Sequence, residues 1–175
     1  MGTALWLTSS AFALAAGITD LRWRKIPNWL TYPAIPVAIL LHWIAAGRHA
    51  ALLSLAGAAL GLGVLLPFVL LRQLGGGDWK LVGALGAFFE PRRLVLVLFV
   101  TLLVNLVMAL ALVIRKRRFL QTIRNMGRIL LSFGSLRAPG QELTIDNPDA
   151  AKVPFGVAAA IAVLLFAASQ DWVVF

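Results

Sequence analysis

Long apolar runs recur along the whole chain, and they constrain the fold more than any other feature of the sequence. The chain has 175 residues, of which 61% are hydrophobic and only 13% are charged. A soluble domain of ordinary composition carries about 25% charged residues. Most of this chain must therefore be surrounded by lipid, where helices satisfy their own backbone polar groups.

We predict an all-α, polytopic membrane bundle of about six transmembrane segments. Polar or glycine-rich breaks divide the apolar runs, and the segments are expected at about residues 3–19, 29–46, 50–71, 79–89, 94–114 and 153–174. A polar turn is expected at 20–28. The fourth run is shorter than the roughly 20 residues that a helix needs to cross lipid. It either borrows length from its flanks, crosses inside the protein or re-enters the membrane.

The pattern predicts a single membrane-embedded domain, residues 1–175, with a basic insertion at about 115–152. The insertion opens with the sequence Arg-Lys-Arg-Arg, and apolar residues then recur at helical spacing with arginines on another face. This pattern predicts an amphipathic helix at about 119–133 that lies on the cytoplasmic membrane surface.

The distribution of positive charge predicts the orientation. The net charge is +9, with 16 basic residues, and loops rich in Lys and Arg stay on the cytoplasmic side. With the N-terminus outside and six alternating segments, the outer loops hold only Arg48, Arg92 and Arg93. Asp20 and Asp78 then lie at cytoplasmic ends of their segments. We expect the basic surface to meet membrane lipids, not nucleic acid.

The sequence contains no cysteine, which excludes disulfides, thiolate zinc sites and a cysteine nucleophile. The two histidines, His42 and His49, fall near the end opposite the two aspartates. We therefore expect neither a metal site nor a cofactor.

Asp20 and Asp78 are the two acidic residues embedded between apolar segments on the same side. A carboxylate near lipid costs free energy and is a candidate for function. Two carboxyl groups in one site of low dielectric cannot both ionise easily, so one keeps a proton. The charged group can take a proton from water while the protonated group polarises a peptide carbonyl, which is acid–base peptide hydrolysis. Which aspartate is the base stays open.

Each aspartate also has a purely structural interpretation. Asp78 can be the N-cap of the helix that follows it. Asp20 can simply end the first segment and pair with Arg22, Arg24 or Lys25.

Four neighbours are candidates for binding substrate or supporting the site: Gly75, Gly77, Lys80 and Asn28. The glycine run before Asp78 permits positive φ and a close backbone approach. Lys80 can lower the cost of ionising Asp78 or extend to the lipid headgroups. Asn28 can hydrogen-bond near the site or cap the second segment.

The sequences around both aspartates resemble motifs of the type IV prepilin peptidases. The segment Asp20-Leu-Arg-Trp-Arg-Lys-Ile-Pro-Asn28 resembles the first motif of that family. The segment Gly75-Gly-Gly-Asp78-Trp-Lys80 resembles the family's GxGD motif with its following lysine. Pro154-Phe155-Gly156 is similar to the proline–aromatic–glycine element that opens the last span of these proteins.

This resemblance implies an aspartic endopeptidase with Asp20 and Asp78 as catalytic residues. Its substrate would be a prepilin or pseudopilin precursor, a membrane-inserted helix whose short basic leader is removed at the cytoplasmic face of the bacterial inner membrane. Larger members also N-methylate the new N-terminus and carry a four-cysteine zinc module. The cysteine-free chain resembles the short form found with Flp or tight-adherence pili, so methyltransferase activity is not expected.

Two other functions are compatible with the same features. A small ion- or proton-coupled transporter would use the same aspartates as its binding site. A non-catalytic assembly protein of a pilus or secretion machine would use the basic surface helix to dock its partners.

Overall fold

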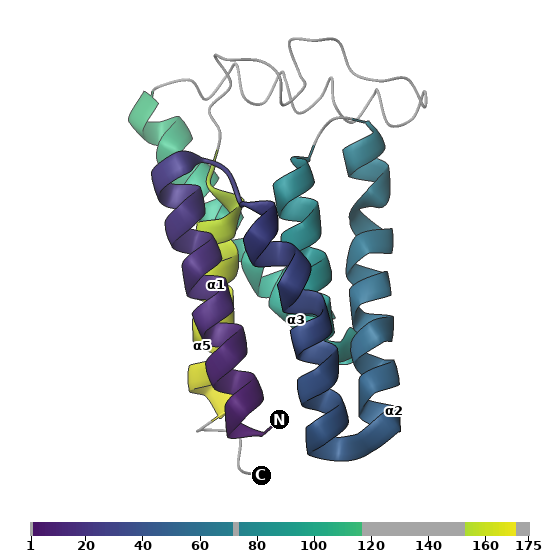
Figure 1. The fold of residues 1–175 in the computed structure, drawn as a ribbon. Helices are drawn as coiled ribbons and strands as arrows, with labels where there is room; N and C mark the ends of the chain where they lie inside the picture. The colour runs from purple at the N-terminus through teal and green to yellow at the C-terminus, as the bar shows by residue number, and fades with distance from the viewer. Residues whose placement is uncertain (1, 72–73, 117–152, 171–175) are drawn as a thin grey trace.

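The computed structural model describes residues 2–71, 74–116 and 153–170, and the regular secondary structure in these ranges is α-helical throughout. The helices are α1 (Thr3–Trp23), α2 (Asn28–Leu70), α3 (Gly76–Lys116) and α5 (Phe155–Gln170). They pack as an upright bundle (Figure 1). The all-α prediction is confirmed.

Two predicted features fall outside the described residues. These are the surface helix at about 119–133 and the last part of the final segment, residues 171–174.

Helix α1 is longer than the sequence predicts. The prediction of a polar turn at 20–28 is wrong for residues 20–23, which are helical. The helix continues to Trp23, and Arg24 ends it in the left-handed conformation with φ 53°. The backbone N–H of Arg24 donates to the carbonyl of Asp20 at 2.8 Å. Charged residues such as arginine are good helix formers, so polarity alone does not stop the helix before Pro27. Asp20 therefore lies in the last turns of α1 and not in a loop.

Helices α2 and α3 each reverse direction at a short non-helical break. In α2 the break is at Ala46, with φ −147°, and Gly47, with φ 74°. In α3 it is at Glu90, with φ 59° and ψ 168°. Figure 1 shows that each helix turns back alongside itself at its break. We call residues 48–70 the second arm of α2 and residues 76–89 the first arm of α3.

A polar cluster holds the break at Glu90, where positive φ is costly for a residue with a side chain. One carboxylate oxygen of Glu90 lies 3.4 Å from Nδ1 of His42, and the other lies 3.6 Å from Arg93. The buried His42 ring also donates from Nε2 to the carbonyl of Phe88 at 3.0 Å. Pro91 follows the break, where its preset φ suits the first position of a helix.

The first arm of α3 is the centre of the bundle. Residues 81–89 are all buried, and at 1.5 Å per residue the arm is only about 20 Å long. Leu81, Leu85 and Phe89 are completely shielded. The short fourth segment therefore lies inside the protein, which is one of the three arrangements left open by its length.

Glycines bring the second arm of α2 and the first arm of α3 into backbone contact. A Cβ on Gly57 would collide with the carbonyl of Gly86, and one on Gly61 would lie 2.6 Å from the carbonyl oxygen of Val82. Side-chain hydrogen bonds join the two arms at both ends of this contact. Ser54 donates to the carbonyl of Ala87 at 2.7 Å, and the indole N–H of Trp79 donates to the carbonyl of Leu62 at 2.7 Å.

Helices α1 and α5 form a second close pair, side by side in Figure 1. A Cβ on Gly17 of α1 would lie 2.9 Å from the Cβ of Ala160 in α5. An aromatic cluster joins this pair to α3. Trp6 and Phe89 have ring centroids 5.6 Å apart, and Phe89 and Phe166 have centroids 6.0 Å apart.

The surface of the bundle identifies a membrane protein. Helices α1, α2 and α3 are each long and apolar enough to cross a membrane. Polar Ser9 and Thr101 are completely buried, whereas apolar Ile44 and Leu70 are 75% and 73% exposed. Burying hydroxyls while exposing large aliphatic side chains is stable only where lipid replaces water.

Substituting Gly86 with alanine is expected to destabilise the bundle by about 1–3 kcal/mol, since a methyl group there overpacks against the backbone of α2. The matched control is Gly63→Ala in α2, because a Cβ on Gly63 has no atom within 4 Å. Thermal unfolding of both variants in detergent, followed by circular dichroism, measures the difference. Equal melting of Gly86→Ala and the wild type would contradict the backbone contact.

Candidate active site

Asp20 is a buried carboxylate near the end of α1. Its side chain is buried, with 6% of the residue exposed. Oδ2 accepts a hydrogen bond from the backbone N–H of Gly156 at 2.7 Å. The backbone of Val157 and the charge of Arg24 also act on this carboxyl group.

The contact between Asp20 and Gly156 depends on the absence of a side chain at position 156. A Cβ there would lie 2.9 Å from the Cβ of Asp20, 3.0 Å from its Oδ2 and 3.2 Å from the carbonyl oxygen of Ala16. These distances are shorter than ordinary van der Waals contacts. Glycine therefore lets the start of α5 reach the aspartate, and any larger residue would separate the two helices.

Asp78 lies in the first turn of α3 and is half-buried. The helix begins at Gly76, and the N–H of Trp79 donates to the carbonyl of Gly75 at 3.1 Å. Asp78 is thus the third residue of the helix, and its interpretation as the N-cap is wrong. Among the residues that the structure describes, no donor forms a hydrogen bond with its carboxyl group.

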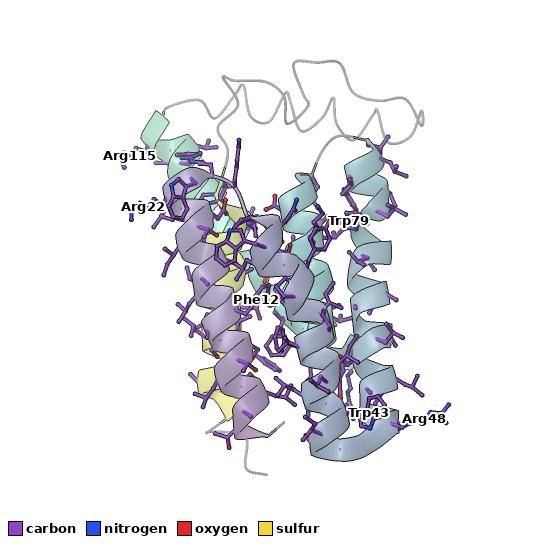
Figure 2. All side chains as sticks on the ribbon, in the orientation of Figure 1. Phe12, Arg22, Trp43, Arg48, Trp79 and Arg115 are labelled. Atoms are coloured by element: carbon purple, nitrogen blue, oxygen red, sulfur yellow. The ribbon has the colours of Figure 1, made fainter. Side chains whose placement is uncertain are left out.

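The fold brings the two aspartates together at one end of the bundle. The two residues belong to different helices, but the carboxyl group of Asp78 lies within reach of the charge of Asp20. Figure 2 shows Arg22, Arg115 and Trp79 toward this end, and Trp43 and Arg48 toward the other.

The glycines before Asp78 allow neighbouring groups to approach closely, and their backbone angles are ordinary. Among the described glycines, positive φ occurs only at Gly47, so the positive φ that the run permits is not used. A Cβ on Gly75 would lie 3.2 Å from Oδ2 of Asp78, and one on Gly77 would lie 3.4 Å from the Cβ of Ile26. The glycine run therefore packs on the connection between α1 and α2 and brings the two motifs into contact.

Lys80 and Asn28 join the starts of α3 and α2. The Lys80 ammonium donates to Oδ1 of Asn28 at 2.9 Å and lies 4.8 Å from the ring centroid of Tyr32. Pro27 occupies the N-cap position of α2, and no side chain caps this helix. Of its two expected roles, Asn28 therefore has the hydrogen bond near the site and not the cap.

Gly156 belongs to the site although residue types and spacing do not predict it. The only signal is the proline–aromatic–glycine element around it. Separately, the described residues contain no group of three or more His, Asp or Glu side chains arranged to hold a metal ion.

The fold and the site define a helical membrane protein with two interacting carboxyl groups at one end of its bundle. The chain belongs to the type IV leader peptidase family, whose sequence model matches residues 7–110. The matched range contains both Asp20 and Asp78 and ends within α3. Membership implies peptidase activity and prepilin-type substrates. No curated protein and no solved structure matches the chain significantly.

The bond between Lys80 and Asn28 is expected to couple the two residues energetically. In a double-mutant cycle of Lys80→Met and Asn28→Ala, we expect a coupling of about 0.5–1 kcal/mol, because each single change removes the same hydrogen bond. Unfolding in detergent measures the coupling. Lys25→Met combined with Asn28→Ala is the control, for which no coupling is expected. Additive effects of the Lys80 pair would refute the contact.

Proposed function

We propose that this chain is an aspartic endopeptidase that removes the short basic leader from prepilin-like precursors. The observation that carries the proposal is that the fold places Asp20 and Asp78 at one end of the bundle, where the charge of Asp20 reaches the carboxyl group of Asp78. Two neighbouring carboxyl groups share one proton more readily than they both ionise. Such a pair supplies a base and an acid to the same reaction, which peptide hydrolysis requires.

The charges of the bundle support cleavage at the cytoplasmic face. Arg22, Arg24 and Lys25 lie at the end that carries Asp20, whereas Arg48 lies at the break of α2, at the opposite end. A bias of this kind orients a membrane protein with the basic end inside. We propose a bacterial inner-membrane protein of six membrane segments with its N-terminus outside, so that the site meets the leader of a membrane-inserted substrate.

We propose that the enzyme acts as a peptidase alone. The sequence holds no cysteine, so it lacks the residues that form the four-cysteine zinc module of the larger, methylating members of the family. In this respect the chain resembles the short prepilin peptidases found with Flp pili.

Replacing either aspartate is expected to lower the cleavage rate by at least about 10²- to 10⁴-fold, since the reaction loses its acid or its base. The measurement is co-expression with a candidate prepilin and mass spectrometry of leader removal, using Asp20→Asn and Asp78→Asn. Both variants should remain in the membrane fraction.

The charge-matched control is Asp146→Asn, which removes a carboxylate outside both motifs and should leave cleavage unchanged. Normal leader removal by either site variant would refute the proposed mechanism.

A further inference from the structure

The two aspartates have unequal surroundings. Burial disfavours the ionised form of both carboxyl groups. At Asp20 this effect is opposed by the Gly156 N–H at 2.7 Å, by the charge of Arg24 and by the backbone of Val157. Asp78 accepts no hydrogen bond from any described residue, and the charge that acts on it is that of Asp20. Backbone N–H donors and a nearby cation stabilise an ionised carboxylate, whereas a nearby anion favours the protonated acid.

The donors on Asp20 come from the start of a helix. The N–H of Ala158 donates to the carbonyl of Pro154 at 3.4 Å, which makes Pro154 the residue that precedes the first turn of α5. The N–H groups of a first turn have no partner within the helix. They also carry the positive end of the helix dipole, where an anion is stabilised. The carboxyl group of Asp20 therefore lies at the N-terminal end of α5, where a negative charge is stabilised.

We propose that Asp20 is the ionised member of the pair and the general base, that Asp78 carries the proton and acts as the general acid, and that Gly156 is the positioning residue that holds Asp20 in this state. The proposal rests on the proposed function and deepens it, because it assigns a separate role to each aspartate.

The assignment gives a balanced reaction. Asp20 takes a proton from water as the water oxygen attacks the peptide carbonyl carbon, and Asp78 gives its proton to the carbonyl oxygen. The resulting diol then collapses: Asp20 returns its proton to the peptide nitrogen, and Asp78 recovers one from a diol hydroxyl. The carbon–nitrogen bond breaks and yields a carboxylic acid and an amine, with both aspartates in their starting states.

The groups that act on Asp20 in the described structure come from the end of α1 and the start of α5. Arg24, which ends α1, supplies a positive charge, and α5 supplies the N–H groups of Gly156 and Val157. In α3, the carboxyl group of Asp78 lies within reach of the charge of Asp20. The ammonium group of Lys80, in α3, donates a hydrogen bond to Oδ1 of Asn28, the first residue of α2, at 2.9 Å.

Infrared spectroscopy can locate the proton without any measurement of catalysis. The protein is prepared with aspartate labelled with ¹³C at the side-chain carboxyl, so that a protonated aspartate gives an isotope-shifted carbonyl band. Asp20→Glu and Asp78→Glu each keep the charge but replace one labelled carboxyl with an unlabelled one. We expect the labelled band to persist in Asp20→Glu and to disappear in Asp78→Glu. Any other pattern overturns the assignment.

The role of Gly156 is tested by Gly156→Ala, whose methyl group would push α5 away from Asp20. Losing the N–H bond disfavours the ionised base, so the acidic limb of the pH–rate profile should move to higher pH by about half to one unit. Gly63→Ala is the control, with no neighbour within 4 Å and no expected shift. A Gly156→Ala enzyme with a lower rate but an unmoved limb would reduce Gly156 to a packing role and overturn its part of the proposal.

The two proposals fail in different ways. If no prepilin is cleaved by the wild-type protein, the proposed function fails while the infrared bands still report where the proton resides. If cleavage depends on both aspartates but the labelled band persists in Asp78→Glu, only the assignment of roles fails.

Discussion

The close backbone contact between the second arm of α2 and the first arm of α3 supports the rest of the structure. At Gly57 and Gly86 the two backbones approach so closely that no side chain fits between them, and hydrogen bonds from Ser54 and Trp79 fasten the two ends. Close packing of small residues replaces the hydrophobic effect as the force between helices in lipid. Since Asp78 precedes Trp79 directly, its position follows from this packing.

Asp20 is positioned by a different contact, between the first and last helices. Its carboxylate meets the start of α5 through Gly156, and Gly17 meets Ala160 further along the same pair. The aromatic cluster of α1, α3 and α5, which includes Phe89, then joins this pair to the centre of the bundle. The site therefore forms where two helix pairs meet, and each pair supplies one carboxyl group.

This arrangement explains how carboxyl groups can persist in a protein that is largely surrounded by lipid. A charge exposed to hydrocarbon is costly, and membrane proteins keep such groups among protein atoms or water. Here the buried Asp20 has a backbone donor at 2.7 Å and the positive charge of Arg24 nearby, and both offset part of the cost of its burial. The same donors distinguish the two carboxyl groups, which links the packing of α5 to the chemistry proposed for the pair.

The sequence by itself determined the class of fold, the breaks near Gly47 and Glu90, and the two motifs, because lipid requires long apolar runs and local residues carry the motifs. It did not determine that α1 continues through Asp20, since polar residues are compatible with a helix. Only the tertiary structure decided that the short fourth segment is enclosed by protein and that Gly156 holds Asp20. Both features arise from contacts between residues far apart in the chain, and these contacts depend on how closely the helix backbones approach.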